Sequence, residues 1–146
     1  MADDVVAIAR AWIGTPYQHQ ASTKGVACDC LGLIRGIWRE RHGSEPEAPP
    51  PYTPDWGEGG GQEVLMAAAL RHLVPIDREA DWLPGDILLF RMRLGAVAKH
   101  LGILSQAGDA PRFIHAYNAH GVIDSPLTAP WQNRIAARFR FPESKD

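Results

Sequence analysis

The chain has 146 residues, a length typical of one domain with a single hydrophobic core, so we expect one domain over residues 1–146. Hydrophobic residues make up 45% of the chain and charged residues 22%, a balance that excludes a disordered or fibrous protein. The formal net charge of -2 argues against nucleic acid as a partner. No apolar run approaches the roughly 18 residues of a membrane-spanning helix, so we expect no membrane insertion.

The first predicted helix begins after Asp3, a candidate N-cap. Apolar residues recur at helical spacing from Val5 to Ile13, and Gly14 then ends the pattern. The acidic start, Met1 to Asp4, lacks the basic and apolar stretches of a secretory signal. We therefore expect synthesis in the cytoplasm without a signal peptide.

A second helix is predicted from Asp29 to Gly43, with Cys30 in its first turn. Cys28 and Cys30 flank a single residue, and a disulfide bridge that short would be strained. We expect two free thiols.

Residues 44–61 hold five prolines and a closing triple glycine, so a long loop is predicted there. Tyr52 and Trp56 allow this loop either to be pinned as a surface connection or to line a substrate site. A third helix is predicted from Glu63 to Leu73.

After the turn signal Leu83-Pro84-Gly85-Asp86 the chain changes to short alternating runs. Strands are predicted at Ile87–Met92, Ala98–Ser105, Arg112–Tyr117, Gly121–Ser125 and Arg134–Phe141. Helices followed by an antiparallel meander indicate the α+β class.

Cys30 has the position of a nucleophile. A thiol attacks an acyl carbon as thiolate, and a helix N-terminus favours that negative charge, so we expect a lowered pKa for Cys30. Asp29 can cap the helix, and the Cys30 amide is a candidate oxyanion donor. The competing interpretation is a buried structural cysteine.

A nucleophilic thiol needs a base. His100 begins an alternating strand, and Gly102 leaves room beside its ring. His115, in the next strand, is placed to orient His100. His120 and Asn118 are reserve candidates for that third position.

Five motifs occur in an order known from one family. They are Gly14-Thr15-Pro16-Tyr17, Cys28-Asp29-Cys30-Leu31-Gly32-Leu33, Leu83-Pro84-Gly85-Asp86-Ile87, His100-Leu101-Gly102-Ile103 and Ile114-His115-Ala116. Together they resemble the NlpC family of papain-like cell-wall cysteine peptidases. Two departures concern the pocket: Leu31 replaces the usual serine, and Gln18-His19-Gln20 stand where glycines often follow the tyrosine.

The resemblance implies a papain-like α+β fold, with N-terminal helices packed on a central antiparallel sheet of about five or six strands. It makes Cys30 the nucleophile, His100 the base, His115 the orienting residue and Tyr17 the tyrosine near the oxyanion site. It implies neither a cofactor nor a metal. The implied reaction is hydrolysis of amide bonds in peptidoglycan stem peptides, commonly the bond from D-glutamate to a diamino acid.

The stretches Arg10–Tyr17 and Pro51–Trp56 look most like peptidases of phages and gene transfer agents. The implied partners are wall stem peptides and phage-like tail or baseplate proteins. The expected location is a phage-like particle that acts in the periplasm or at the cell wall.

Three alternatives compete with this reading. Cys28, Cys30, His100 and His115 could form a zinc site, although the Cys-x-Cys spacing is unusual for one. A catalytically silent wall-binding or tail-tip module of the same fold is the second. The third is an amidase or acyltransferase acting on another substrate.

Overall fold

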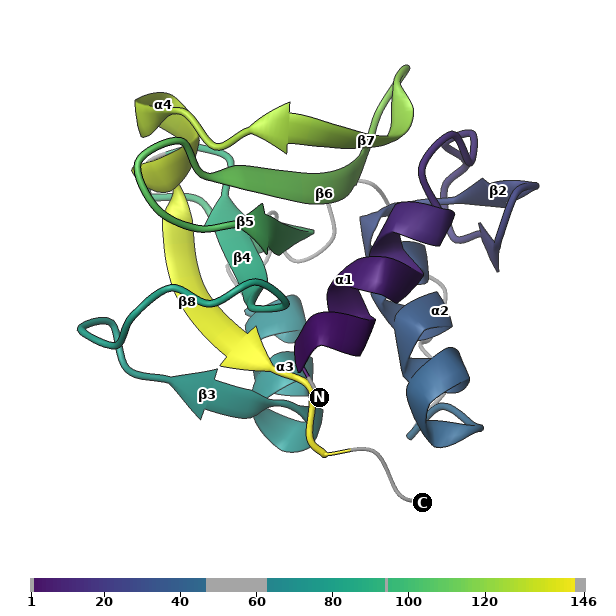
Figure 1. The fold of residues 1–146 in the computed structure, drawn as a ribbon, viewed down its shortest axis with the longest axis horizontal. Coiled ribbons are helices and arrows are strands. Elements are labelled where there is room, and N and C mark those ends of the chain that lie inside the picture. The colour runs from purple at the N-terminus through teal and green to yellow at the C-terminus, as the bar shows by residue number, and fades with distance from the viewer. Residues whose placement is uncertain (1, 47–62, 94, 144–146) are drawn as a thin grey trace.

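The computed structural model describes residues 2–46, 63–93 and 95–143. Its helices are α1 (Ala2–Ala11), α2 (Cys30–His42), α3 (Val64–His72) and α4 (Ala129–Gln132). Its strands are β1 (Ser22–Thr23), β2 (Ala27–Cys28), β3 (Val74–Ile76), β4 (Ile87–Arg91), β5 (Ala98–Gln106), β6 (Arg112–Tyr117), β7 (Gly121–Pro126) and β8 (Ile135–Arg140). Three helices precede the strands of the six-stranded antiparallel sheet, which confirms the predicted α+β class (Figure 1).

The three predicted helices form close to their predicted bounds. α1 ends at Ala11, two residues before Ile13, and the chain tightens there through backbone bonds from Trp12 to Ala9 and from Ile13 to Arg10. These bonds span three residues, which is common in the last turn of a helix. The Tyr52 and Trp56 positions of the predicted loop lie outside the described residues.

Six strands form one antiparallel sheet in the order β3-β8-β4-β5-β6-β7. The predicted simple meander is wrong for its last strand, because β8 returns across the sheet to pair with β4 instead of β7. β3 was not predicted as a strand. It contains Pro75, which lacks a backbone donor and is tolerated at this edge position.

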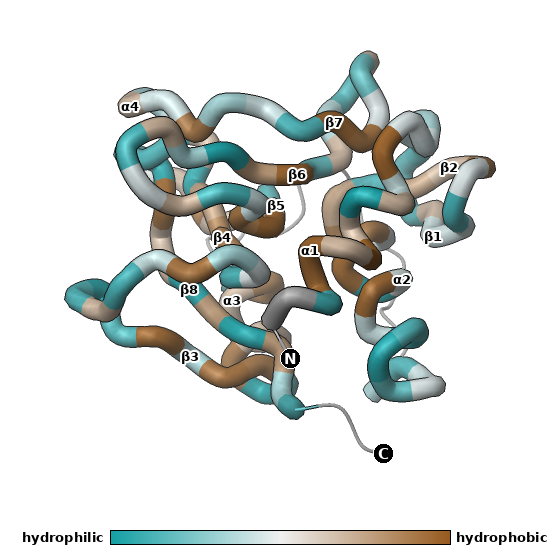
Figure 2. The backbone as a smooth tube through the Cα atoms, in the orientation of Figure 1, coloured by the Kyte–Doolittle hydropathy of each residue, from teal (hydrophilic) through white to brown (hydrophobic). Residues whose placement is uncertain are grey.

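The two faces of the sheet are covered differently. On one face α1, α2 and α3 bury a core with Trp12, Leu33, Ile37 and Ile103 at its centre. Figure 2 shows hydrophobic stretches in these helices and in the central strands, and residues of both contribute to this core. The other face carries a smaller cluster of Leu88, Phe90, Leu104, Phe113 and Leu127, against which Trp131 of α4 packs.

Close approach of α1 and α2 depends on a glycine. A Cβ atom built at Gly36 would lie 2.0 Å from the buried Trp12 ring, so a larger residue would push the helices apart. This contact keeps α2 against the sheet and places its N-terminus beside β5. Within the part of the chain that the structure describes, no helix has the length and apolar character needed to cross a bilayer.

Candidate active site

The first turn of α2 is held by a buried carboxylate. Asp29 is the N-cap, as predicted, and its Oδ1 accepts the Gly32 backbone N–H at 2.7 Å. Its Oδ2 accepts the Gln20 backbone N–H, also at 2.7 Å. Gly32 is required here, because a Cβ atom would lie 1.9 Å from the Ala21 carbonyl oxygen. Cys30, the first residue of α2, therefore has a fixed backbone.

Two of the residues that stand where the family often has glycines, His19 and Gln20, contact Asp29. Gln20 has a positive φ of 67°, a conformation that favours glycine, and its hydrogen bond to Asp29 helps to hold it there. His19 Nδ1 lies 3.7 Å from Asp29 Oδ2. The segment that follows Tyr17 is thus fastened to the helix cap without glycine.

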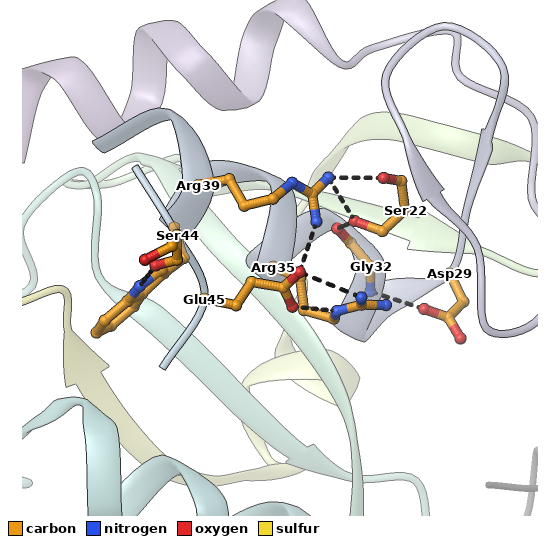
Figure 3. A network of polar contacts seen from close by, with 8 residues as sticks. Ser22, Asp29, Gly32, Arg35, Arg39, Ser44 and Glu45 are labelled. Carbon is orange, nitrogen blue, oxygen red and sulfur yellow. Dashed lines mark hydrogen bonds and ion pairs between the residues drawn. The ribbon is translucent and has the colours of Figure 1, made fainter. Parts of the chain in front are cut away.

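A polar network fastens Ser22, which precedes α2 in the chain, and Glu45, which follows it, to the helix (Figure 3). The Ser22 hydroxyl donates to the Gly32 carbonyl at 2.6 Å, and Arg39 donates to the Ser22 carbonyl at 2.6 Å. Glu45 accepts from Arg35 at 2.5 Å and from Arg39 at 3.1 Å. The network joins the first turn of α2 to the residues that precede and follow the helix.

The Cys30 thiol lies against the strand that carries His100. Its Sγ donates to the Lys99 carbonyl oxygen at 3.7 Å. The pairing of β5 with β6 runs only as far as Ile103 and Ile114, so the edge of β5 near His100 is open to the thiol. Since a carbonyl oxygen and the next Cα atom are close neighbours, the His100 Cα lies within roughly 7 Å of the sulfur.

His100 and His115 form a buried pair. Their side chains come from adjacent strands, and His100 Nε2 lies 2.8 Å from His115 Nδ1. A Cβ atom at Gly102 would come within 2.7 Å of the Phe113 ring and 3.4 Å of the His115 Cβ, which explains the glycine between them. The structure thus joins the two histidines singled out in the sequence, and it leaves His100 Nδ1 as the nitrogen not used in the pair.

The ionisation of the site differs from the sequence-based expectation. Burial, together with a smaller effect of the Asp29 carboxylate, raises the pKa of the Cys30 thiol to about 12. The amides of Leu101, Leu31 and Cys30 lower that pKa without offsetting burial. The expectation of a lowered thiol pKa is therefore wrong for this conformation, because removal of the sulfur from water outweighs the helix N-terminus.

Burial also keeps the two imidazoles neutral. It lowers the pKa of His100 to about 4 and that of His115 to about 3, where the neighbouring His100 and His120 also contribute. At neutral pH His100 is therefore unprotonated and able to accept a proton. The resting site holds a thiol and a neutral base.

Tyr17 lies on the thiol side of the site. Its ring is half-buried, and its backbone forms an isolated bridge with Cys28. Burial, together with smaller effects of charge on Cys30 and Asp29, raises the pKa of the Tyr17 hydroxyl to about 12. Its proton is therefore retained for donation at neutral pH.

Two site residues were missed by the sequence analysis. Ser125 of β7 lies 3.1 Å from His115 Nε2 through its hydroxyl. The Trp131 ring lies 5.6 Å from that of His100 and 5.3 Å from that of His115, so it covers the pair. Neither residue belongs to a recognisable motif. The register of β7 brings Ser125 to His115, and α4 brings Trp131 to the histidine pair.

The reserve candidates and the metal alternative are also located. The His120 ring stacks on Tyr117 at 5.7 Å and does not replace His115 in the pair, and the structure shows no side-chain bond for Asn118. Cys28 is fully buried and free. Across residues 2–46, 63–93 and 95–143, no group of three or more His, Cys, Asp or Glu side chains is arranged to hold a metal ion.

Known structures share this arrangement of helices and sheet. An NlpC/P60 family protein from Bacillus cereus ATCC 10987 superposes with a TM-score of 0.66, at 23% identity over 97% of this chain and 40% of its own. The NlpC/p60 domain of the peptidoglycan hydrolase SagA gives a TM-score of 0.58, at 21% identity over 97% of this chain and 98% of its own. This chain has the NlpC/P60 fold. The papain-like fold expected from the motifs is thereby confirmed.

Sequence comparison agrees with the NlpC/P60 fold. The chain is 28% identical over 143 residues to the probable endopeptidase NlpC of Escherichia coli (strain K12), covering 92% of this chain and 79% of that protein. An NLP/P60 family protein similar to a lipoprotein, from Staphylococcus aureus subsp. aureus Mu50, gives a TM-score of 0.60 at 19% identity over 98% of this chain and 42% of its own. No family model matches the chain. The chain thus spans less than half of two of these larger relatives.

Proposed function

We propose that this NlpC/P60 domain is a cysteine peptidase that hydrolyses amide bonds of peptidoglycan stem peptides. The observation that carries the proposal is a thiol at a capped helix N-terminus, set against the strand of a buried histidine pair. The relatives described as a probable endopeptidase and as a domain of a peptidoglycan hydrolase support the same chemistry.

The neutral resting site favours general-base catalysis. As the Cys30 sulfur attacks the carbonyl carbon, its proton passes to His100 Nδ1, while Nε2 keeps its hydrogen bond to His115. The protonated His100 then gives that proton to the leaving amine as the C–N bond breaks, which leaves a thioester on Cys30. A water molecule, deprotonated by His100, hydrolyses the thioester and restores the thiol.

The developing oxyanion needs donors near the sulfur. The Cys30 amide in the first turn of α2 and the Tyr17 hydroxyl are the two that we assign to this role. The high pKa of Tyr17 suits a hydrogen-bond donor, because the hydroxyl keeps its proton at neutral pH.

Two finer proposals rest on the resemblance of Arg10–Tyr17 and Pro51–Trp56 to peptidases of phages and gene transfer agents. We place the scissile bond between D-glutamate and the diamino acid of the stem peptide. We also propose that a phage-like particle carries the domain, through contacts with tail or baseplate proteins, to the periplasm or the cell wall. Fragment masses test the first proposal, and detection of the chain in purified particles tests the second.

The decisive experiment is digestion of purified sacculi followed by mass spectrometry of the fragments. Cys30→Ser and His100→Ala should each abolish release of fragments, while His115→Ala should lower the rate less than His100→Ala. Cys28→Ser is the matched control, since it removes a neighbouring thiol outside the site and should leave hydrolysis nearly unchanged. Activity that survives Cys30→Ser but not Cys28→Ser would overturn the assignment of the nucleophile.

The second candidate is a catalytically silent module that binds wall peptides. The raised pKa of the Cys30 thiol favours it, because a thiol that keeps its proton is a weak nucleophile. This function predicts that the protein sediments with sacculi, releases no fragment, and binds equally well as the Cys30→Ser variant.

A further inference from the structure

We propose that Ser125 is a positioning residue for the histidine pair: its hydroxyl oxygen accepts the His115 Nε2 proton and stabilises the protonated form of His100. This inference rests on the proposed function, because His100 is protonated only when Cys30 gives up its proton. It extends the histidine pair by one hydroxyl, so that hydrogen bonds run from His100 through His115 to Ser125.

The register of β6 and β7 brings the hydroxyl to His115. His115 lies opposite Ile123, and Phe113 lies opposite Ser125. His115 and Ser125 are therefore diagonal neighbours on one face of the sheet. Their atoms Nε2 and Oγ are 3.1 Å apart, while His115 Nδ1 is 2.8 Å from His100 Nε2. Both nitrogens of His115 are thus engaged.

Counting the hydrogen atoms shows why this contact matters. When both imidazoles are neutral, the hydrogens of the chain can point in either direction, since a serine hydroxyl donates and accepts. When His100 is protonated, both of its nitrogens carry hydrogen, and its Nε2 must donate to a lone pair on His115 Nδ1. The His115 proton then resides on Nε2, and only an acceptor at the position of the Ser125 oxygen satisfies it.

The surroundings make an acceptor at this position important. The pair is buried, with His100 8% exposed and His115 1% exposed, and an unsatisfied donor is costly in such a place. The titratable groups around His115 are His100 on β5, Tyr117 on β6 and His120 in the following turn. None of these neighbours supplies a carboxylate.

Two further elements bring polar groups to the residues around the pair. The Cys30 thiol of α2 contacts the Lys99 carbonyl, next to His100 in the chain, and Asp29 precedes Cys30. After α4 the Arg134 guanidinium lies over the Trp131 ring that covers the pair. Among the described contacts of His115, the Ser125 hydroxyl is the hydrogen-bond partner of Nε2. Loss of this hydroxyl should therefore disfavour the protonated pair more than the neutral one.

The test measures the rate at which iodoacetamide alkylates Cys30 as a function of pH, with tandem mass spectrometry to separate Cys30 from Cys28. No peptidoglycan is present. At pH 7 the thiol gives its proton to His100 as the sulfur attacks iodoacetamide, so Ser125→Ala should lower the rate about tenfold, the effect of one hydrogen bond. As the pH rises toward the pKa of the Cys30 thiol, hydroxide removes the proton directly, and the rates of variant and parent should converge.

Two further variants separate this role from simple packing. Ser125→Thr keeps the hydroxyl and should restore the pH 7 rate. Ser105→Ala removes a serine hydroxyl of β5 that donates to the Asp124 carboxylate of β7 at 3.0 Å, and should leave the alkylation profile unchanged. Near-UV circular dichroism reports whether each variant is folded.

The inference is overturned if folded Ser125→Ala alkylates at the parent rate at pH 7, or if Ser125→Thr loses as much as Ser125→Ala. Digestion of sacculi by the same variants distinguishes the two proposals. If Ser125→Ala lowers the alkylation rate tenfold and the parent protein releases no wall fragment, the role of Ser125 is supported and the proposed peptidase activity is refuted.

Discussion

Replacement of Asp29 should separate the stability of the site from its reactivity. The carboxylate is 2% exposed and accepts two backbone N–H groups, those of Gly32 and Gln20, each at 2.7 Å. Asp29→Ala removes an N-cap, which costs about 1 kcal/mol, and a second bond to a charged acceptor, which costs about 2 kcal/mol. We expect a total loss of about 3 kcal/mol in the free energy of unfolding.

The conservative variant Asp29→Asn should lower the stability of the protein and raise the reactivity of the Cys30 thiol. Asp29→Asn keeps one oxygen and places an amide group near one of the donors, so it should cost about half as much as Asp29→Ala. It also removes the negative charge that raises the pKa of the Cys30 thiol. The variant should therefore be less stable than the parent and yet alkylate faster at a fixed pH near 8.

Urea unfolding followed by tryptophan fluorescence measures the stability, since the chain has five tryptophans. Glu40→Gln is the control. It breaks an exposed ion pair with Lys24 at 3.1 Å and should change stability by less than about 0.5 kcal/mol. Parent-like stability of Asp29→Ala, or slower alkylation of Asp29→Asn, would refute this reasoning.

Three other predictions concern the sheet and its histidines. Gly102→Ala should lower hydrolysis of sacculi at least tenfold, because its Cβ would displace the Phe113 ring and crowd His115; parent-like kinetics would contradict the packing. Asp86→Ala should cost about 3–5 kcal/mol in urea unfolding, because it leaves the buried Arg138 guanidinium without its carboxylate at 3.1 Å; a loss below about 1 kcal/mol would be incompatible with this pair. The lowered pKa values of His100 and His115 mean that the unfolded chain binds more protons between about pH 4 and 6.5, so stability should be present above pH 6.5 and lost as the pH falls toward 4. Unfolding of His115→Asn should depend less steeply on pH in that window.

Much of the local structure was readable from the sequence. The helix around Cys30 was predicted from its apolar spacing and its cap Asp29, and both are present. All five predicted strands, β4 to β8, agree with the structure to within one residue at each end. The reason is that caps, turns and alternation are signals carried by neighbouring residues.

Other features depended on contacts between distant parts of the chain. The place of β8 beside β4 was not predicted, because a strand's own pattern does not name its partner. β3 and α4 are short and contain proline, so they lacked a periodic signal. The contact between His115 and Ser125 follows only from the β6–β7 register.

By itself the sequence determined the α+β class, the capped helix that begins at Cys30, and the histidines that merit attention, since these depend on local spacing and on the order of motifs. Only the tertiary structure decided how those groups are charged. Burial by β5 and its neighbours raises the pKa of the Cys30 thiol and lowers that of His100, which reverses the expectation from the helix terminus alone. Loss of water depends on everything packed around a group, and for that reason no short stretch of sequence reports it.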